Sequence, residues 1–177
     1  MSGFIPGFSN TLNAKAALYR ELALQCAELL QGQRNAVANM ANVAALVYHA
    51  LRDAPAREGK PVNWAGFYLR DAAQTDTLVL GPFQGRPACT EIALGRGVCG
   101  TAASEGRTVL VADVREFPGH IACDAASRSE IVVPLRAADG RVLGVFDIDA
   151  SEVGSFDEYD RTGLEAIARM VVEASDM

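Results

Sequence analysis

The sequence predicts an α+β fold, one domain with a central, largely antiparallel sheet of about six strands flanked by helices. The chain has 177 residues, the usual length of a single domain. Half of the residues are apolar and 21% are charged, which supplies enough material for a core. Most of the predicted strands are joined as hairpins, which favours antiparallel pairing. We expect one domain over 1–177, with a helical pair at 1–55, the sheet and the loops of the site at 61–150, and a C-terminal helix at 155–175.

Composition and charge disfavour several classes of protein. The net charge is −6, from 22 acidic and 16 basic side chains, whereas a nucleic-acid binder normally carries a basic patch. No apolar run reaches the roughly 18 residues that a membrane span requires. Residues 1–6 lack the basic and apolar regions of a signal peptide. We therefore expect a cytoplasmic protein, in which four cysteines form no permanent structural framework.

Two amphipathic helices are predicted at the start of the chain. Apolar residues recur at helical spacing over 12–30, and Gly32 ends that stretch. A second stripe covers 37–51 and ends before Pro55. Cys26 lies on the first stripe, where we expect a small core residue rather than a reactive thiol.

Segments typical of strands follow the two helices. The β-branched, leucine and aromatic residues of 62–69 and 77–83 predict a strand pair around a polar turn at 71–76. The glycines and prolines of 81–87 predict an irregular loop. The elements predicted next are a strand at 90–94, a helix at 98–105, a strand at 108–112 and a long connection at 113–127. A connection of that length in a compact domain is typical of a functional or mobile loop.

The last part of the sheet is predicted to be a hairpin. Strands at 131–135 and 142–148 flank Asp139 and Gly140, a preferred pair for a two-residue turn. Ser155 with Glu158 three residues later predicts a capping box at the start of the final helix.

This hairpin predicts a face that carries three acids. With Asp139 and Gly140 as the two loop residues, Glu130 lies opposite Asp149. The same count places Val132 opposite Asp147. Because strand side chains alternate between faces, the three acids then share one face. Like charges placed opposite each other destabilise a sheet, so the pattern indicates either a cationic guest or protons held at raised pKa.

Other interpretations of these acids remain open. The strand ends could simply be solvated near Arg128, because charges on sheet edges also prevent aggregation. Carboxylates also suit magnesium or calcium, although no calcium-loop pattern is present. A one-residue change in loop length would separate Glu130 from the two aspartates. The ammonium group of a substrate fits the acids as well as a metal does, and it fits better beside thiols.

Three cysteines lie outside the apolar stripes and are candidates for redox chemistry. Cys99 falls in the first turn of a predicted helix, where a thiol pKa is usually lowered. Cys123 opens a run of small residues that could form one helical turn, and Cys89 lies in the loop rich in glycine and proline. A nucleophile and a resolving thiol are therefore plausible, although bystander cysteines are common. A zinc site formed by these cysteines and His120 stays open, although their spacing matches no zinc knuckle.

Two further motifs are expected to be structural. Residues 95–100 (GRGVCG) match GxGxxG, with Asp113 downstream, but the helix that follows is too short for a dinucleotide site. We expect a tight turn into a short helix. His120 is expected to form hydrogen bonds within its loop, and its nearness to Cys123 makes it a candidate base or orienting residue.

Six segments together closely resemble the free methionine-(R)-sulfoxide reductase family of GAF-domain proteins. The resemblance covers nearly the whole chain and includes all three loop cysteines and the Asp-Ile-Asp strand. The segments that carry it are 63–69, 80–85, 95–102, 119–127, 129–135 and 144–149.

The resemblance implies a thiol mechanism without a bound cofactor or metal. Cys123 would attack the sulfoxide sulfur, and Cys89 would resolve the resulting sulfenic acid as a disulfide. Thioredoxin would reduce that disulfide with electrons from thioredoxin reductase and NADPH. Cys99 would be a pocket residue or an alternative resolving thiol. The family also implies a role in oxidative stress, a cytoplasmic location and a homodimer.

The resemblance also implies the residues that bind the substrate. Trp64 would pack on the methyl group of the substrate, with Tyr68 nearby, although core packing of Trp64 is the alternative. The three acids Glu130, Asp147 and Asp149 would bind the ammonium group and protonate or hydrogen-bond the sulfoxide oxygen. A non-catalytic GAF module that senses a small ligand is the rival function. The single-domain length and the three loop cysteines argue against that module.

Overall fold

The computed structural model describes residues 8–57, 59–70, 73, 76–121 and 123–177, with side chains from residue 14 onward. Residues 1–6, predicted to contain no signal peptide, and most of the turn predicted at 71–76 lie outside these residues. The described part forms one six-stranded antiparallel sheet in the order β3-β2-β1-β6-β5-β4, which confirms the predicted fold class. The strands are β1 (Val62–Arg70), β2 (Thr77–Gly85), β3 (Glu91–Ala93), β4 (Val109–Val111), β5 (Ser129–Arg136) and β6 (Val142–Ala150).

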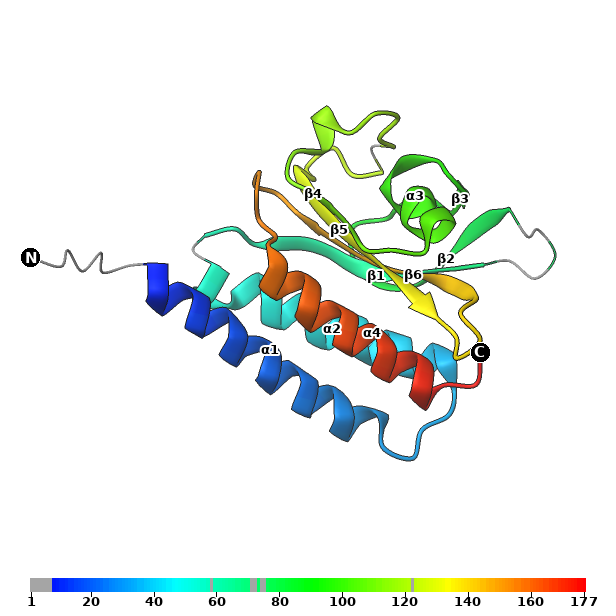
Figure 1. Cartoon of the computed structure of the whole chain (residues 1–177), viewed down its shortest axis with the longest axis horizontal. Helices are drawn as coiled ribbons and strands as arrows, with labels where there is room; N and C mark the ends of the chain where they lie inside the picture. Colours follow the sequence, from blue (N-terminus) through cyan, green and yellow to red (C-terminus); the bar gives the residue numbers. More distant parts are fainter. Residues whose placement is uncertain (1–7, 58, 71–72, 74–75, 122) are drawn as a thin grey trace, which may run out of the picture.

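Helices cover both faces of the sheet (Figure 1). Three long helices pack on one face, α1 (Phe8–Leu30), α2 (Ala36–Asp53) and α4 (Glu158–Ala174). The short helix α3 (Gly97–Glu105) and the loops around it cover the other face. None of the described helices is long and apolar enough to cross a membrane.

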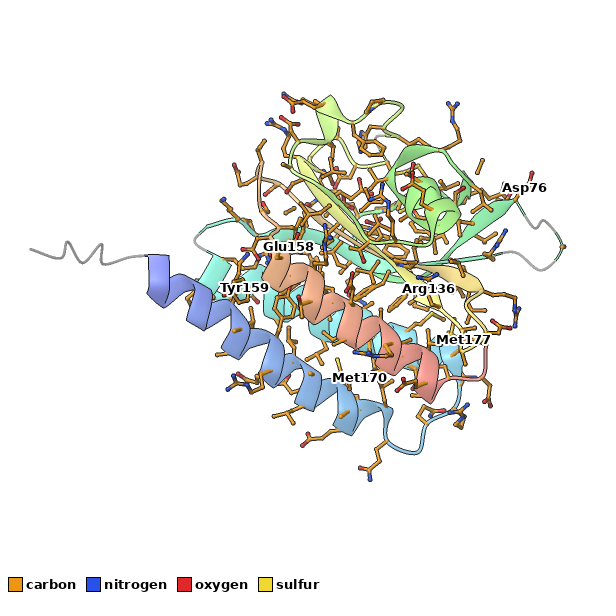
Figure 2. The ribbon with its side chains drawn as sticks, viewed as in Figure 1. Asp76, Arg136, Glu158, Tyr159, Met170 and Met177 are labelled. Carbon is orange, nitrogen blue, oxygen red and sulfur yellow. A yellow bond between two sulfur atoms is a disulfide. The ribbon has the colours of Figure 1, made fainter. Side chains whose placement is uncertain are left out.

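The alternation of strand residues therefore supplies two separate apolar clusters. The larger cluster lies under the long helices and includes Ile131, Val133 and Leu135 of β5. The smaller cluster lies under α3 and includes Val132 of the same strand. Successive side chains of β5 thus point to opposite layers. Figure 2 shows α4, labelled at Glu158, Tyr159 and Met170, lying along the side of the sheet away from α3.

The hairpin between β5 and β6 has the predicted register, although its turn differs from the prediction. The backbone N–H of Ala137 donates to the carbonyl of Arg141, so the loop has three residues rather than two. A bulge beside Leu135 then restores the register, and Glu130 lies opposite Asp149 as predicted. The extra loop residue and the bulge shift the pairing of β5 and β6 in opposite directions. Counting from a two-residue turn therefore still predicts the correct partner for each residue.

The predicted capping box of the final helix is wrong. The hydroxyl of Ser155 donates to the carbonyl of Glu152, so it is engaged in the preceding turn. Asp157 is the N-cap of α4 instead, and its side chain accepts from the backbone N–H of Asp160. The side chain of Asp160 accepts in return from the N–H of Asp157, and Glu158 becomes the first helical residue.

The loop predicted at 81–87 is also partly wrong, because β2 continues to Gly85. β3 pairs only with the first part of β2, so the later residues of β2 lie on an open edge. Pro82 lies at a bulge opposite β1, where its missing N–H breaks no ladder. The extension of β2 positions the segment that carries Cys89.

A buried ion cluster joins the helices on the face opposite α3. The fully buried carboxylate of Asp160 accepts hydrogen bonds from Lys15 (2.6 Å), Tyr19 (2.8 Å) and Arg57 (2.9 Å). These donors lie in α1 and in the turn η1 (Pro55–Arg57), so one side chain connects three segments. Each buried charge has its partners, which is the condition under which such a cluster is tolerated.

Asp160→Asn should therefore destabilise the fold. The substitution keeps the shape of the side chain but removes the counter-charge of buried Arg57 and leaves Lys15 with Asp157 alone. We expect the free energy of unfolding to fall by about 3 kcal/mol, measured by urea denaturation. Asp139→Asn, which breaks an exposed ion pair with Arg141, is the control and should not move the midpoint. A midpoint for Asp160→Asn equal to that of the unsubstituted chain would contradict this assignment.

Candidate active site

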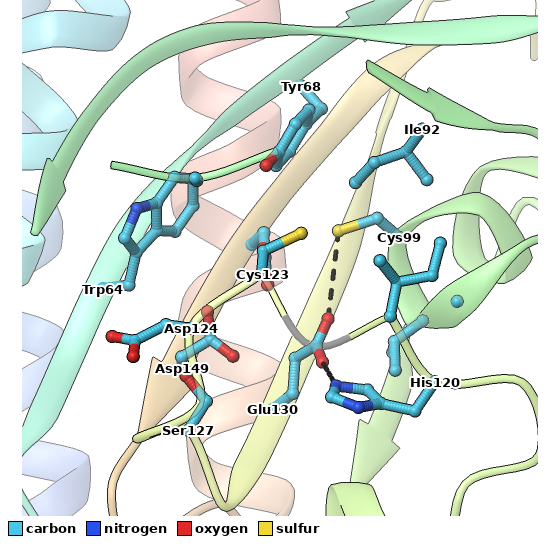
Figure 3. A pocket seen from close by; sticks show the side chains of 15 residues that line it. Trp64, Tyr68, Ile92, Cys99, His120, Cys123, Asp124, Ser127, Glu130 and Asp149 are labelled. Carbon is cyan, nitrogen blue, oxygen red and sulfur yellow. Dashed lines mark hydrogen bonds and ion pairs between the residues drawn. The ribbon is translucent and has the colours of Figure 1, made fainter. Parts of the chain in front are cut away.

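A small pocket lies between the sheet and α3 (Figure 3). β1, β5 and β6 supply its floor, α3 supplies one wall, and the loops that carry Cys89 and Cys123 close it. Its volume is about 40 Å³. All eight site residues predicted from the sequence lie in or at this pocket. They are Trp64, Tyr68, Cys89, Cys99, Cys123, Glu130, Asp147 and Asp149.

The three acids share one face, as predicted from the hairpin. Glu130 pairs with Asp149, and Val132 pairs with Asp147 across β5 and β6. All three carboxyl groups line the pocket, and those of Glu130 and Asp147 are buried. The strand ends are therefore not simply solvated, which was one of the alternatives.

Burial raises the pKa of all three carboxyl groups. For Glu130 burial is the largest cause, and the Asp149 carboxylate adds to it while the His120 imidazole opposes it, so that the pKa rises to about 7. Burial and then the Glu130 carboxylate hold the pKa of Asp147 well above its ordinary value. Burial and the Asp147 carboxylate do the same to the pKa of Asp149. The site can therefore hold protons on carboxyl groups near neutral pH.

The His120 side chain contacts Glu130, and its backbone N–H forms the expected hydrogen bond within the loop, to the carbonyl of Phe117. Its Nε2 atom lies 3.5 Å from Oε2 of Glu130, and both side chains are largely shielded from solvent. The loop that carries His120 follows the short turn η2 (Val114–Glu116). Of the two roles considered from the sequence, orientation of a neighbouring group is the one that this geometry favours.

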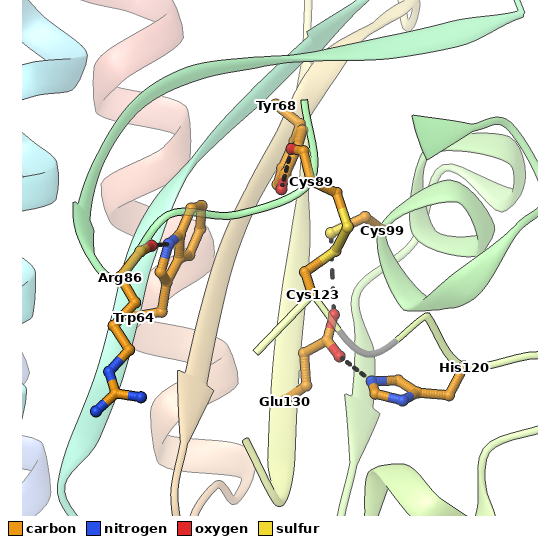
Figure 4. The surroundings of a disulfide bond; sticks show 8 residues. All are labelled: Trp64, Tyr68, Arg86, Cys89, Cys99, His120, Cys123 and Glu130. Atoms are coloured by element: carbon orange, nitrogen blue, oxygen red, sulfur yellow. Dashed lines mark hydrogen bonds and ion pairs between the residues drawn. A yellow bond between two sulfur atoms is a disulfide. The ribbon is translucent and has the colours of Figure 1, made fainter. Parts of the chain in front are cut away.

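Cys89 and Cys123 form a disulfide (Figure 4). Their Cα atoms are 5.4 Å apart although 34 positions separate them in the sequence. Neither cysteine is fully buried. The two thiols are therefore close enough to react with each other, and a zinc site that uses both of them does not form in this state.

Two aromatic side chains hold the Cys89 segment in place. The hydroxyl of Tyr68 donates to the backbone carbonyl of Cys89 (2.9 Å). The indole N–H of Trp64 donates to the carbonyl of Arg86 (3.1 Å). Both aromatic residues belong to β1, so the sheet itself positions the loop (Figure 4).

Trp64 is both a core residue and a pocket residue. Its ring stacks between Tyr68 and Phe83, with centroid distances of 5.9 and 5.3 Å. Gly66 leaves room for this stack, because a Cβ there would lie 2.3 Å from Cβ of Phe83. The edge of the Trp64 ring still lines the pocket. Trp64 therefore packs in the core and also lines the pocket, and its contact with a substrate methyl group stays a prediction.

The expected low pKa of Cys99 is wrong. Cys99 does lie in the first turn of α3, but it is buried and its Sγ atom is 3.9 Å from Oε1 of Glu130. Burial, followed by the charges of Asp147, Glu130 and Asp149, raises the pKa of this thiol well above its ordinary value. These effects outweigh the helix terminus, so Cys99 remains a protonated thiol beside the acids.

The GRGVCG motif forms a tight turn into a short helix, as expected. Gly95 and Gly97 have positive φ values of 75° and 60°. At Gly100 a Cβ would lie 2.3 Å from the carbonyl oxygen of Ala93, so the helix packs closely on the turn. The connection joins antiparallel elements and lacks the parallel βαβ unit of a dinucleotide site.

Three polar residues that support the cysteine loop were not predicted from the sequence. The Asn63 side chain donates to Asp124 (3.3 Å) and to Ser127 (3.1 Å), and Ser127 forms a hydrogen bond with Asp149. The run after Cys123 is a single turn closed from Ser127 N–H to the Asp124 carbonyl. Their positions beside Trp64 and Cys123 were the available signal.

One further group of side chains has the spacing of a metal site. Ligand atoms of Cys99, Glu130 and Asp147 lie within 4.8 Å of one another. The pKa of each of the three groups is raised, so near neutral pH they tend to keep protons that a metal would have to displace. The arrangement suits proton storage and transfer better than metal binding.

Comparisons with known proteins identify the family to which this chain is similar. The model of the GAF domain family matches residues 42–174. The free methionine-R-sulfoxide reductase of Saccharomyces cerevisiae is 45% identical over 164 residues, which are 93% of this chain and 88% of the relative. The Escherichia coli protein of the same name is 45% identical and covers 86% of both chains.

Comparison with solved structures leads to the same family. The free methionine-R-sulfoxide reductase of Neisseria meningitidis in complex with its substrate superposes with a TM-score of 0.82, at 46% identity, over 90% of this chain and 89% of the other. A GAF domain from an Acinetobacter phosphoenolpyruvate-protein phosphotransferase has a TM-score of 0.73 at 14% identity, covering 89% and 92% of the two chains, and so shares the fold alone.

The raised pKa of Glu130 predicts how stability depends on pH. A carboxyl group whose pKa is raised by folding stabilises the fold fully below its unfolded pKa, and this contribution is lost as pH rises through about 7. Glu130→Gln cannot ionise, so its melting temperature relative to the unsubstituted chain should rise by a few degrees between about pH 4.5 and 7 and then level off.

Thermal unfolding from pH 4 to pH 8.5 measures this difference. Glu116→Gln removes an exposed carboxyl group and serves as the control for the change in charge. If the melting temperatures of Glu130→Gln and of the unsubstituted chain changed with pH in parallel, the raised pKa of Glu130 would be contradicted.

Proposed function

The chain belongs to the GAF domain family and, within it, to the free methionine-R-sulfoxide reductases, and we propose that it reduces free L-methionine-(R)-sulfoxide to methionine. The observation that carries the proposal is the Cys89–Cys123 disulfide beside three carboxyl groups of raised pKa. A module that only senses a ligand needs neither the redox pair nor the protonated acids.

In the first step the Cys123 thiolate attacks the sulfoxide sulfur. The sulfoxide oxygen takes a proton from the carboxyl cluster, for which Glu130 has a suitable pKa. The resulting hydroxyl group moves to the Cys123 sulfur, while the S–O bond of the substrate and the new bond between the two sulfurs break. Methionine leaves in the thioether state, two electrons richer, and Cys123 becomes a sulfenic acid. Protonation matters because the oxygen is a poor leaving group without it.

In the second step Cys89 attacks the sulfenic acid of Cys123. A disulfide forms and the oxygen leaves as water, which balances the two electrons gained by the substrate. The Tyr68 and Trp64 hydrogen bonds to the segment 86–89 support this step because they hold Cys89 above the pocket. The structure corresponds to the state after this step.

A small dithiol protein of the thioredoxin class would complete the cycle. Cys89 and Cys123 are partly exposed, so a thiolate from such a protein can reach the disulfide. Thioredoxin reductase and NADPH would supply the electrons, and the chain itself would need no bound cofactor. A cytoplasmic homodimer that repairs oxidised methionine is the setting that we propose.

The remaining pocket residues would bind the amino acid. Asp147 and Asp149 face the pocket and suit an ammonium group, which would relieve part of their repulsion. The Trp64 ring edge suits the methyl group on the sulfur. Cys99, as a protonated thiol, can donate a hydrogen bond to a carboxylate or to the sulfoxide oxygen.

The disulfide state leaves too little room for this substrate. A volume of about 40 Å³ holds about three water molecules. Methionine sulfoxide is much larger, so we expect the loops that carry Cys89 and Cys123 to separate when the disulfide is reduced. The substrate would then enter only the reduced protein.

Isothermal titration with methionine-(R)-sulfoxide tests this order of events. Cys123→Ser cannot form the disulfide or turn over, and it should bind the sulfoxide saturably. The oxidised, unsubstituted chain should give no binding signal at the same concentrations. The methionine-(S)-sulfoxide isomer is the control ligand. Equal binding by the oxidised chain and by Cys123→Ser would show that the pocket does not close.

Cysteine variants test the chemistry itself. In an NADPH-coupled assay with thioredoxin and its reductase, Cys123→Ser should reduce the rate to background. Cys89→Ser should release about one methionine per chain and then stop, because the sulfenic acid is not resolved. Cys26→Ser, in the core under the long helices, is the control and should keep full activity.

Two results would change this assignment. Multiple turnovers by Cys123→Ser would eliminate the nucleophile. Multiple turnovers by Cys89→Ser with Cys99 present, lost in the double variant, would transfer the resolving role to Cys99.

A further inference from the structure

A second, larger cavity lies away from the thiols, at the edge of the sheet where β5 continues past its pairing with β4. Its volume is about 490 Å³, and it lies between α4, the end of β5 and the turn that follows α3. Figure 2 labels Arg136 at the end of β5 beside α4. The cavity is lined by Gly106, Arg107, Thr108, Val133, Pro134, Arg136, Arg161, Glu165 and Arg169.

Arginine dominates this lining although the chain as a whole is acidic. Four arginines and one glutamate give the lining a formal charge of +3, compared with −6 for the chain. Three separate elements supply the arginines, so the cluster is not one charged helix face.

Among the described residues, two of the four arginines have acidic partners and two do not. Arg107 pairs with Glu105, and Arg161 lies 3.4 Å from Glu158. No ion pair joins Arg136 or Arg169 to any residue that the structure describes.

Arg161, which lines the cavity, has one nitrogen without a partner in the described part of the chain. Nε of Arg161 is buried and has no hydrogen-bond partner among the described residues. The Glu165 carboxylate accepts from the Thr108 hydroxyl and is therefore already engaged. The Arg161 side chain is 36% exposed, so its other atoms remain accessible to a ligand in the cavity.

We propose that this cavity binds a small phosphorylated molecule. Guanidinium groups present paired N–H donors that match phosphate oxygens, and a lining charge of +3 suits a group that carries about two negative charges better than a single carboxylate. Arg136, Arg161 and Arg169 would hold the phosphate group. Val133, Pro134 and Gly106 leave an apolar wall for the rest of the molecule. The volume falls in the range of small-ligand sites, about 300–1,000 Å³.

This site is separate from the thiol pocket. Glu130 lies near the start of β5 and Arg136 at its end, which places them about 20 Å apart along the strand. None of the residues that line one cavity lines the other. Binding can therefore be measured without reference to turnover.

Titration with inorganic pyrophosphate at constant ionic strength tests the proposal. We expect saturable binding at one site by calorimetry, with amide shifts in the NMR spectrum confined to 106–108, 133–136 and 161–169. The double variant Arg136→Gln/Arg169→Gln should weaken binding at least about tenfold. Both side chains are exposed, so the variant should keep the melting temperature of the unsubstituted chain.

Arg20→Gln is the matched control, because it removes an exposed arginine from α1, outside the cavity. It should bind pyrophosphate as the unsubstituted chain does. The proposal is overturned if binding does not saturate, if the amide shifts are spread over the surface, or if the double variant binds as tightly as Arg20→Gln.

Discussion

The site depends on the burial of three like-charged groups on one face of a hairpin. Glu130, Asp147 and Asp149 would repel one another as carboxylates, and burial removes the water that would screen them. The fold tolerates them because they retain protons at pH values where exposed acids are ionised. The register of β5 and β6 imposes this arrangement, since a slip of one residue on β5 would turn Glu130 toward the long helices. Acid chemistry at neutral pH is therefore a consequence of strand pairing.

The same chain contains a buried acid that has the opposite role. Asp160 accepts from two cations and a hydroxyl group, so its charge is compensated and it connects α1, η1 and α4. Asp147, in contrast, has a buried Oδ1 atom with no partner among the described residues. The sheet separates the two environments. Paired charge stabilises the helical side, while the α3 side keeps acids whose protons can be transferred.

The sequence predicted most of the fold and much of the site because the relevant signals were periodic. Alternation along β5 and β6 was sufficient to bring Glu130 and Asp149 together, even though the turn between them differs from the prediction. The predicted cap at Ser155 failed because Asp157 offers the same chemistry two residues later. The loop prediction at 81–87 failed because an open sheet edge accepts proline at a bulge.

The sequence by itself determined the order of the elements, the face on which the acids lie and the family that the cysteine segments resemble. Those properties follow from the spacing of residues that lie close together in the sequence. Only the tertiary structure decided that Cys99 lies buried against carboxyl groups and is therefore a weak acid, and that His120 contacts Glu130. It also decided that arginines from three elements share one cavity. Such environments arise from contacts between segments far apart in the chain, and no local pattern encodes them.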